Sequence, residues 1–81
     1  MVRYSVLAQR DSEEPTNFVT VPALPGCFAQ GATIEQALEH AREAIALHIE
    51  GFVKRGEPAP IEAQTPLLTV VEVDAPVSAG V

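Results

Sequence analysis

Alternation of apolar and polar positions predicts a first strand near the N-terminus. Tyr4, Val6 and Ala8 recur at every second position, and a period of two is typical of a half-buried β-strand. The polar run over residues 11–17 follows, and its turn-forming residues predict a hairpin loop. The apolar run over residues 18–21 then predicts a second strand that returns antiparallel to the first.

Two prolines and a glycine interrupt the extended pattern after this second strand. Pro22 and Pro25 each lack a backbone N–H, and Gly26 tolerates a positive φ. We therefore expect the chain to bend between residues 21 and 27. A third short strand is predicted for residues 27–30.

A helical pattern begins after the third strand. Thr33 and Gln36 have the T-x-x-Q spacing of a capping box, in which each side chain satisfies an amide N–H at the helix start. Gly56 suits the left-handed position that follows a helix, and Pro58 prevents continuation. At about 100° per residue, the stripe predicted to cover the sheet consists of Ile34, Leu38, Ala41, Ile45, Ile49 and Phe52, with Ala37 and His48 at its margin.

Residues 67–73 predict a last strand, because they are rich in β-branched residues and largely apolar on both faces. The predicted fold is α+β, with a two-layer β-β-β-α-β order and one long helix packed on a small mixed sheet. A right-handed crossover through the helix would place the last strand parallel to a neighbour. Residues 1–74 are predicted to form a single domain, and residues 75–81 a flexible C-terminal tail.

Length and charge narrow the possible partners. A chain of 81 residues is near the size at which one hydrophobic core is marginal, so we expect a homo-oligomer, either a dimer or a tetramer. The net charge of -6 disfavours direct nucleic-acid binding and favours a basic protein partner. The apolar runs are too short to cross a bilayer and no leader precedes Tyr4, so we expect a cytoplasmic protein without membrane contact.

The residues that could carry chemistry are few and scattered. His40 and His48 are separated by about 12 Å of helical rise, too far to share a metal or a proton. Cys27 has no evident base nearby and is predicted to be a buried structural thiol. Glu72 and Asp74 are the only candidates for a metal-dependent nuclease site, and such a pair usually only solubilises a strand end. We therefore predict no enzyme activity, no cofactor and no metal site.

Several motifs spread along the chain resemble one protein family. They are Pro22, Leu24, Pro25, Gly26 and Cys27 of a V-P-x-L-P-G-C element, Gly31 and Thr33 of a G-x-T-x-x-x-A-L element, and Gly56 of the closing G-E-P. On these residues most of the chain resembles the HicB-like antitoxin family. The resemblance implies a partial, inactive RNase H-like fold of β-β-β-α-β order. It also implies that the protein neutralises a small basic mRNA-cleaving toxin of the HicA type by covering it.

One alternative remains open beside this hypothesis. Antitoxins of this family usually carry a C-terminal DNA-binding segment, and we expect none after Val73, so the chain resembles the N-terminal domain alone. The protein could instead be a stand-alone homo-oligomeric module that binds a small ligand or another protein without a toxin partner. Its candidate partner-binding residues lie on the helix flank around Leu47, which the helical pattern places away from the core stripe, and they are His40, Ala44, Leu47 and Gly51.

Overall fold

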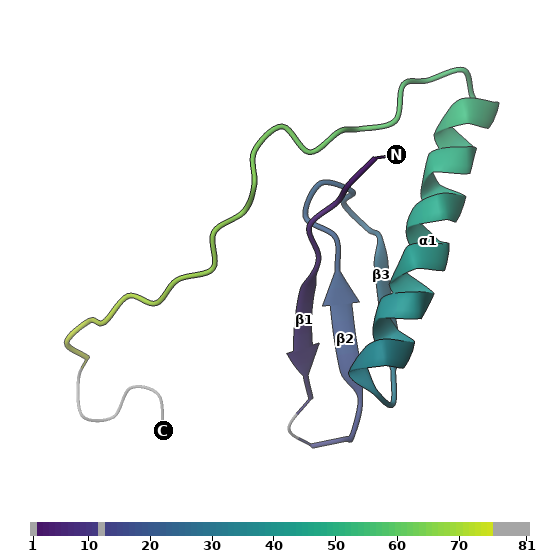
Figure 1. Ribbon diagram of the computed structural model, residues 1–81. Coiled ribbons are helices and arrows are strands. Elements are labelled where there is room, and N and C mark those ends of the chain that lie inside the picture. Colours follow the sequence, from purple (N-terminus) through teal and green to yellow (C-terminus); the bar gives the residue numbers. More distant parts are fainter. Residues whose placement is uncertain (1, 12, 76–81) are drawn as a thin grey trace.

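The fold consists of a three-stranded antiparallel sheet and one long helix on one of its faces (Figure 1). The computed structural model describes residues 2–11 and 13–75. The strands are β1 (Leu7–Arg10), β2 (Asn17–Thr20) and β3 (Phe28–Gly31), and the helix is α1 (Ile34–Lys54). The predicted α+β class is confirmed, and so are the helix and the three strands before it, with strand bounds shifted by one to three residues.

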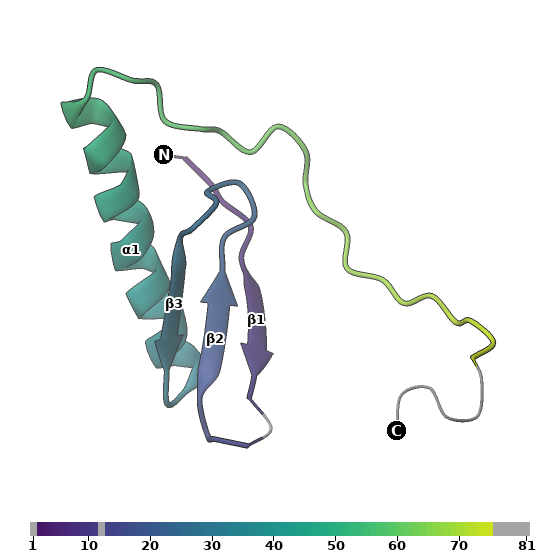
Figure 2. The ribbon, with the colours of Figure 1, turned by 180° about the vertical axis from the view of Figure 1, so that it is seen from behind.

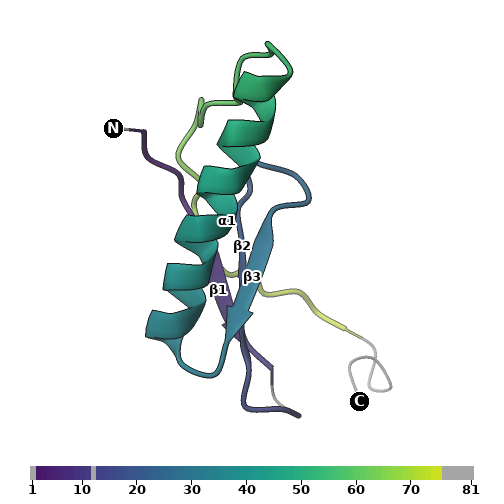
Figure 3. The ribbon, with the colours of Figure 1, turned by 90° about the vertical axis from the view of Figure 1, so that its right-hand side faces the viewer.

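The strand register separates two faces of the sheet. β2 lies between β1 and β3 and pairs antiparallel with both. Ala8, Val19 and Ala29 are directly opposite one another and lie on the face toward α1. The next row, which includes Phe28, projects to the other side because side chains alternate along a strand. Figure 3 shows α1 along one face of the sheet, and on the uncovered face Phe28 is 65% exposed.

Small residues allow α1 to lie close to the sheet. Val19 and Ala29 pack with Ala37 and Ala41 of α1 in one buried cluster. At Gly31 an added Cβ would lie 2.6 Å from the backbone nitrogen of Ala37, so only glycine fits there. The helix contacts mainly β3 and, to a lesser extent, β2.

The buried side of α1 differs from the predicted stripe. Ala37, which the sequence placed at the margin, is 0% exposed, whereas Ile34 and Leu38 are 39% and 42% exposed. The reason is the lateral position of α1, which packs mainly on β3 and β2, so the side of the helix that carries Ile34 and Leu38 is only partly covered.

The V-P-x-L-P-G-C element forms two consecutive β-turns. The Leu24 N–H donates to the Val21 carbonyl at 3.0 Å, and the Cys27 N–H donates to the Leu24 carbonyl at 2.9 Å. Each turn has a proline at its second position, where a fixed φ near −65° is favourable. Gly26 has a φ of 84°, which the third position of a type II turn requires. The turns place Leu24 in the core with 1% of its surface exposed.

Both ends of α1 are capped. Thr33 Oγ1 accepts a hydrogen bond from the Gln36 N–H at 3.1 Å. Gln36 Oε1 accepts from the Ala32 N–H at 2.7 Å, one residue before the N–H that a capping box uses. Gly56 has a φ of 71° and its N–H donates to the Val53 carbonyl at 3.0 Å, as in a Schellman motif.

The structure contradicts the predicted last strand. Residues 67–73 pair with no strand in the described part of the chain, so the sheet is wholly antiparallel rather than mixed. Their apolar side chains are 78–85% exposed, and these are Leu67, Leu68, Val70, Val71 and Val73. Strand propensity favours an extended backbone, but it does not specify which edge of a sheet receives the segment.

We call residues 63–75 the C-terminal arm. Figures 1 and 2 show from opposite sides that this arm runs apart from the sheet. The Cα radius of gyration is accordingly 16.1 Å, against about 12 Å for a compact domain of this length. Of the tail predicted for residues 75–81, only Ala75 lies within the described residues, and it is exposed.

Candidate functional site

The four candidate partner-binding residues lie along one side of α1, and we call them the Leu47 flank (His40, Ala44, Leu47 and Gly51). Two of them are engaged within the fold. His40 Nδ1 lies 2.7 Å from the Gln30 carbonyl oxygen of β3, and it donates to this oxygen because a carbonyl only accepts. Ala44 packs, half-buried, against the turn cluster that contains Leu24. Leu47 in contrast is 68% exposed.

Leu47 and Gly51 line an open cavity near the end of α1. Its volume is about 290 Å³, and its lining is completed by His48, Phe52 and Arg55. The Arg55 guanidinium carbon lies 4.8 Å from the centroid of the Phe52 ring, a cation–π distance. The helical pattern places Phe52 in the core stripe and His48 at its margin. His48 precedes Gly51 by three residues and Phe52 by four, and this spacing is the signal that could have placed His48 and Phe52 in this site.

Carboxylates border Leu47 on its other side. Glu43 precedes Leu47 by four residues and Glu50 follows it by three, so both are its neighbours on the helix surface. Both are exposed. An ion pair joins Lys54 Nζ and Glu50 Oε1 at 3.4 Å, but an exposed pair of this kind contributes little stability. An exposed leucine beside carboxylates suits the surface of a basic protein.

No site for a metal is assembled by residues 2–11 and 13–75, within which no three His, Cys, Asp or Glu side chains converge. Glu72 and Asp74 are exposed on the C-terminal arm. In the same ranges every buried side-chain nitrogen or oxygen has a hydrogen-bond partner, so none of them points to a missing ligand. No helix of this part of the chain has the length and hydropathy to cross a membrane.

Burial governs the chemistry of Cys27. The residue is 4% exposed and lies in the cluster with Val21 and Leu24, so its predicted burial is confirmed. Loss of hydration raises the pKa of the Cys27 thiol above its ordinary value of 9.0. The thiolate is the reactive form, so the folded protein keeps this sulfur in its unreactive state.

We expect Cys27 in the folded protein to react with a thiol reagent at least about 100-fold more slowly than in urea-unfolded protein, because labelling requires local opening. The folded pKa is raised, so the stability contributed by Cys27 is complete below pH 9.0 and falls as the pH rises above it. In Cys27→Ala this part of the loss of stability at alkaline pH is expected to be absent. Labelling at the same rate in folded and unfolded protein would contradict the assignment.

Comparison with known sequences identifies the family. Residues 4–75 match the family described as the HicB-like antitoxin of bacterial toxin-antitoxin system. The chain belongs to the HicB-like antitoxin family. The match continues through residue 75, so the matched region includes the C-terminal arm.

Relatives of the HicB-like chain occur in archaea and bacteria. A UPF0150 protein of Thermoplasma acidophilum is 44% identical over 59 residues, which cover 73% of this chain and 84% of that protein. A UPF0150 protein of Synechocystis is 36% identical over 59 residues, or 73% of each chain. The N-terminal domain of the antitoxin HicB of Burkholderia pseudomallei is similar in structure, with a TM-score of 0.67 and 33% identity, over 74% of this chain and 69% of that chain. This likeness agrees with the resemblance seen in the motifs.

Proposed function

We propose that this protein is a non-enzymatic antitoxin-type binding protein that neutralises a small basic mRNA-cleaving toxin of the HicA type by covering it. The observation that carries the proposal is the match of residues 4–75 to the HicB-like antitoxin family. The net charge of -6 supports it, since opposite charge accelerates encounter with a basic partner and disfavours other partners.

The toxin contacts the Leu47 flank in this proposal. Leu47 provides an exposed apolar anchor, and the adjacent cavity of about 290 Å³ receives a side chain of the toxin. Glu43 and Glu50 border the anchor and face basic groups of the partner. His40 and Ala44 have a different task, because their contacts with Gln30 and the turn cluster hold this part of α1 in place.

Binding is tested with a purified HicA-type toxin encoded in the same genome, by calorimetry and by rescue of growth during toxin expression. We expect Leu47→Lys to weaken binding by about tenfold or more, because it removes the apolar anchor and adds a charge of the partner's sign. Val53→Lys is the matched control. Val53 is 67% exposed, against 68% for Leu47, but it lies on another side of α1.

The unsubstituted chain tests whether the protein binds the toxin, and the two variants test where on α1 the toxin binds. If the unsubstituted chain neither binds the toxin nor restores growth, the proposed function fails. If it binds and Leu47→Lys binds equally well, the Leu47 flank is not the contact surface. An equal loss of toxin affinity in Leu47→Lys and Val53→Lys would mean that the net charge of the chain, rather than the Leu47 flank, governs binding.

A second function, that of a stand-alone homo-oligomeric module, is supported by one observation. The C-terminal arm exposes apolar side chains that belong to the matched domain, as expected when another chain covers them. A toxin partner is not needed for this function.

A further inference from the structure

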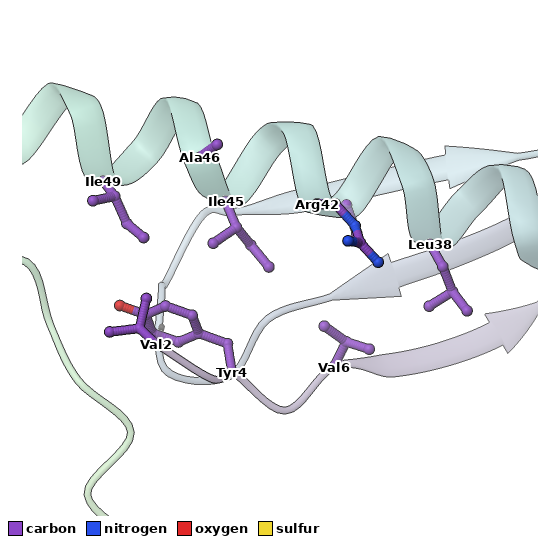
Figure 4. A pocket seen from close by; sticks show the side chains of 9 residues that line it. Val2, Tyr4, Val6, Leu38, Arg42, Ile45, Ala46 and Ile49 are labelled. Atoms are coloured by element: carbon purple, nitrogen blue, oxygen red, sulfur yellow. The ribbon is translucent and has the colours of Figure 1, made fainter.

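An apolar groove runs between the N-terminal segment and one side of α1 (Figure 4), and we call it the N-terminal groove. Its volume is about 650 Å³, which is within the range of small-molecule sites. Its apolar walls are Val2, Tyr4 and Val6 on one side and Leu38, Ile45 and Ile49 of α1 on the other. None of the described residues that line it also lines the cavity beside Leu47, so the two are separate sites.

The wall formed by residues 2–6 is held in place from outside the groove. Every second side chain of this segment lines the groove, as in an extended chain. On the outer side, the Glu62 carboxylate accepts hydrogen bonds from the Ser5 N–H at 2.7 Å and from the Ser5 hydroxyl at 2.9 Å. The Tyr4 hydroxyl donates to the Pro60 carbonyl. The groove is therefore preformed, and a ligand does not have to order this wall when it binds.

Arg42 is the one charged side chain among the described residues that line the groove. Figure 4 shows its side chain between those of Leu38 and Ile45, pointing from α1 toward the groove. Its Nε lies 3.9 Å from Glu39 Oε2, which is beyond hydrogen-bond distance. A guanidinium has five N–H donors, so Arg42 remains available to a carboxylate that enters the groove.

The walls and the guanidinium together indicate the chemistry of a ligand. A guanidinium binds a carboxylate through two parallel N–H donors. The apolar walls are aliphatic apart from Tyr4, which suits a hydrocarbon chain. Arg42 and Ile49 are separated by about 10 Å of helical rise, so the groove extends far enough beyond the guanidinium to hold such a chain.

We propose that the N-terminal groove binds a fatty-acid-type ligand, namely an ionised carboxylic acid with an unbranched aliphatic chain. The carboxylate of the ligand pairs with Arg42, and the chain lies between Tyr4 on one wall and Ile45 and Ile49 on the other. Glu39 competes with the ligand for Arg42, so its charge opposes binding. Binding of this ligand does not require a toxin, and its absence would leave the proposed function untouched.

The first experiment titrates the full chain with decanoate, and Tyr4 reports the binding. The chain contains one tyrosine and no tryptophan, so a change in protein fluorescence arises at the groove wall. We expect saturable binding of one decanoate per chain, at concentrations below those at which decanoate forms micelles. Octanoate is expected to bind about three- to tenfold more weakly, because it buries two fewer methylene groups. The absence of saturable binding, or equal affinity for the two acids, would overturn the proposal.

The second experiment uses two substitutions on α1 with effects of opposite sign. Arg42→Gln is expected to weaken decanoate binding by about three- to fivefold, the size of an exposed ion pair. Glu39→Gln is expected to strengthen it by about twofold, because the competing carboxylate is removed. Lys54→Gln is the matched control, since it removes the same charge from the last turn of α1 and leaves the affinity unchanged. Equal decanoate affinity of Arg42→Gln and Lys54→Gln would overturn the proposal.

A third experiment tests the C-terminal arm as a rival occupant of the groove. The arm begins on the outer side of the N-terminal segment, where Thr65 lines a cavity with Arg3 and Ser5. The doubly substituted Val70→Ser, Val71→Ser chain lacks apolar side chains with which an arm would fill the groove, and we expect its affinity for decanoate to be unchanged. Saturable binding in this double variant alone would show that an arm, of the same or of another copy, covers the groove, and would overturn the proposal.

Discussion

Leu24→Ala is expected to lower the free energy of unfolding by about 2–5 kcal/mol, because the substitution leaves a cavity where a leucine side chain was fully packed. Leu24 is 1% exposed and packs with Val21 and Cys27. A loss of this size is a large part of the stability of a small domain. Urea unfolding followed by helical circular dichroism, at one protein concentration, measures it.

The control for this substitution is Leu47→Ala. Leu47 is 68% exposed, so the same truncation is expected to change the free energy of unfolding by less than about 0.5 kcal/mol. Similar losses at the two positions would show that Leu24 does not support the core. If Leu24→Ala had the same urea midpoint as the unsubstituted protein, the two consecutive turns would not depend on their buried leucine.

Gly31→Ala is expected to lower the free energy of unfolding by at least about 1–3 kcal/mol, the usual cost of overpacking. The new Cβ would lie 2.6 Å from the nitrogen and 3.0 Å from the Cα of Ala37. Both are backbone atoms, so the clash is not relieved by a side-chain rotation, and the start of α1 has to move away from β3. The same urea unfolding experiment measures the effect.

Gly51→Ala is the matched control for Gly31→Ala. At Gly51 a Cβ meets only the end of the flexible Arg55 side chain at 3.4 Å, and alanine is the better helix former. We therefore expect Gly51→Ala to stabilise the protein by about 0.5–1 kcal/mol. If the two glycine substitutions changed the free energy of unfolding in the same direction, close packing at Gly31 would not be the cause of the effect of Gly31→Ala.

The elements with local signals could be predicted from the sequence. The bounds of α1 follow from Thr33 at one end and Gly56 at the other, where a cap and a left-handed glycine satisfy backbone groups within a few residues. The turn after β2 likewise follows from its prolines and Gly26. In each case the deciding interactions are between residues close in sequence.

Features that depend on where α1 and the C-terminal arm lie relative to the strands could not be predicted. Helical periodicity groups Ile34 and Leu38 with the core, but only the position of α1 over β2 and β3 decides that Ala37 is buried instead. The arm shows the same limit, since apolarity predicts a strand and does not identify the edge that pairs with it.

The sequence predicts that Leu47 is exposed but does not predict the contacts around it. The exposure of Leu47 follows from its angle on the helix, and the structure places it at 68%. The hydrogen bond from His40 to Gln30 could not be foreseen, because it joins α1 to β3 across ten residues of sequence. Arg55 and Phe52 border the Leu47 flank through helical spacing instead, since Arg55 follows Gly51 by four residues.

The exposed arm separates two demands on this sequence that most small domains have to satisfy with the same residues. Substitutions in residues 63–75 leave the packing around Leu24 and Gly31 unchanged, because the arm is exposed along its whole described length. Those residues are available for contacts with other molecules. Related chains can therefore diverge in sequence along the arm, and so in what they contact, without loss of the fold.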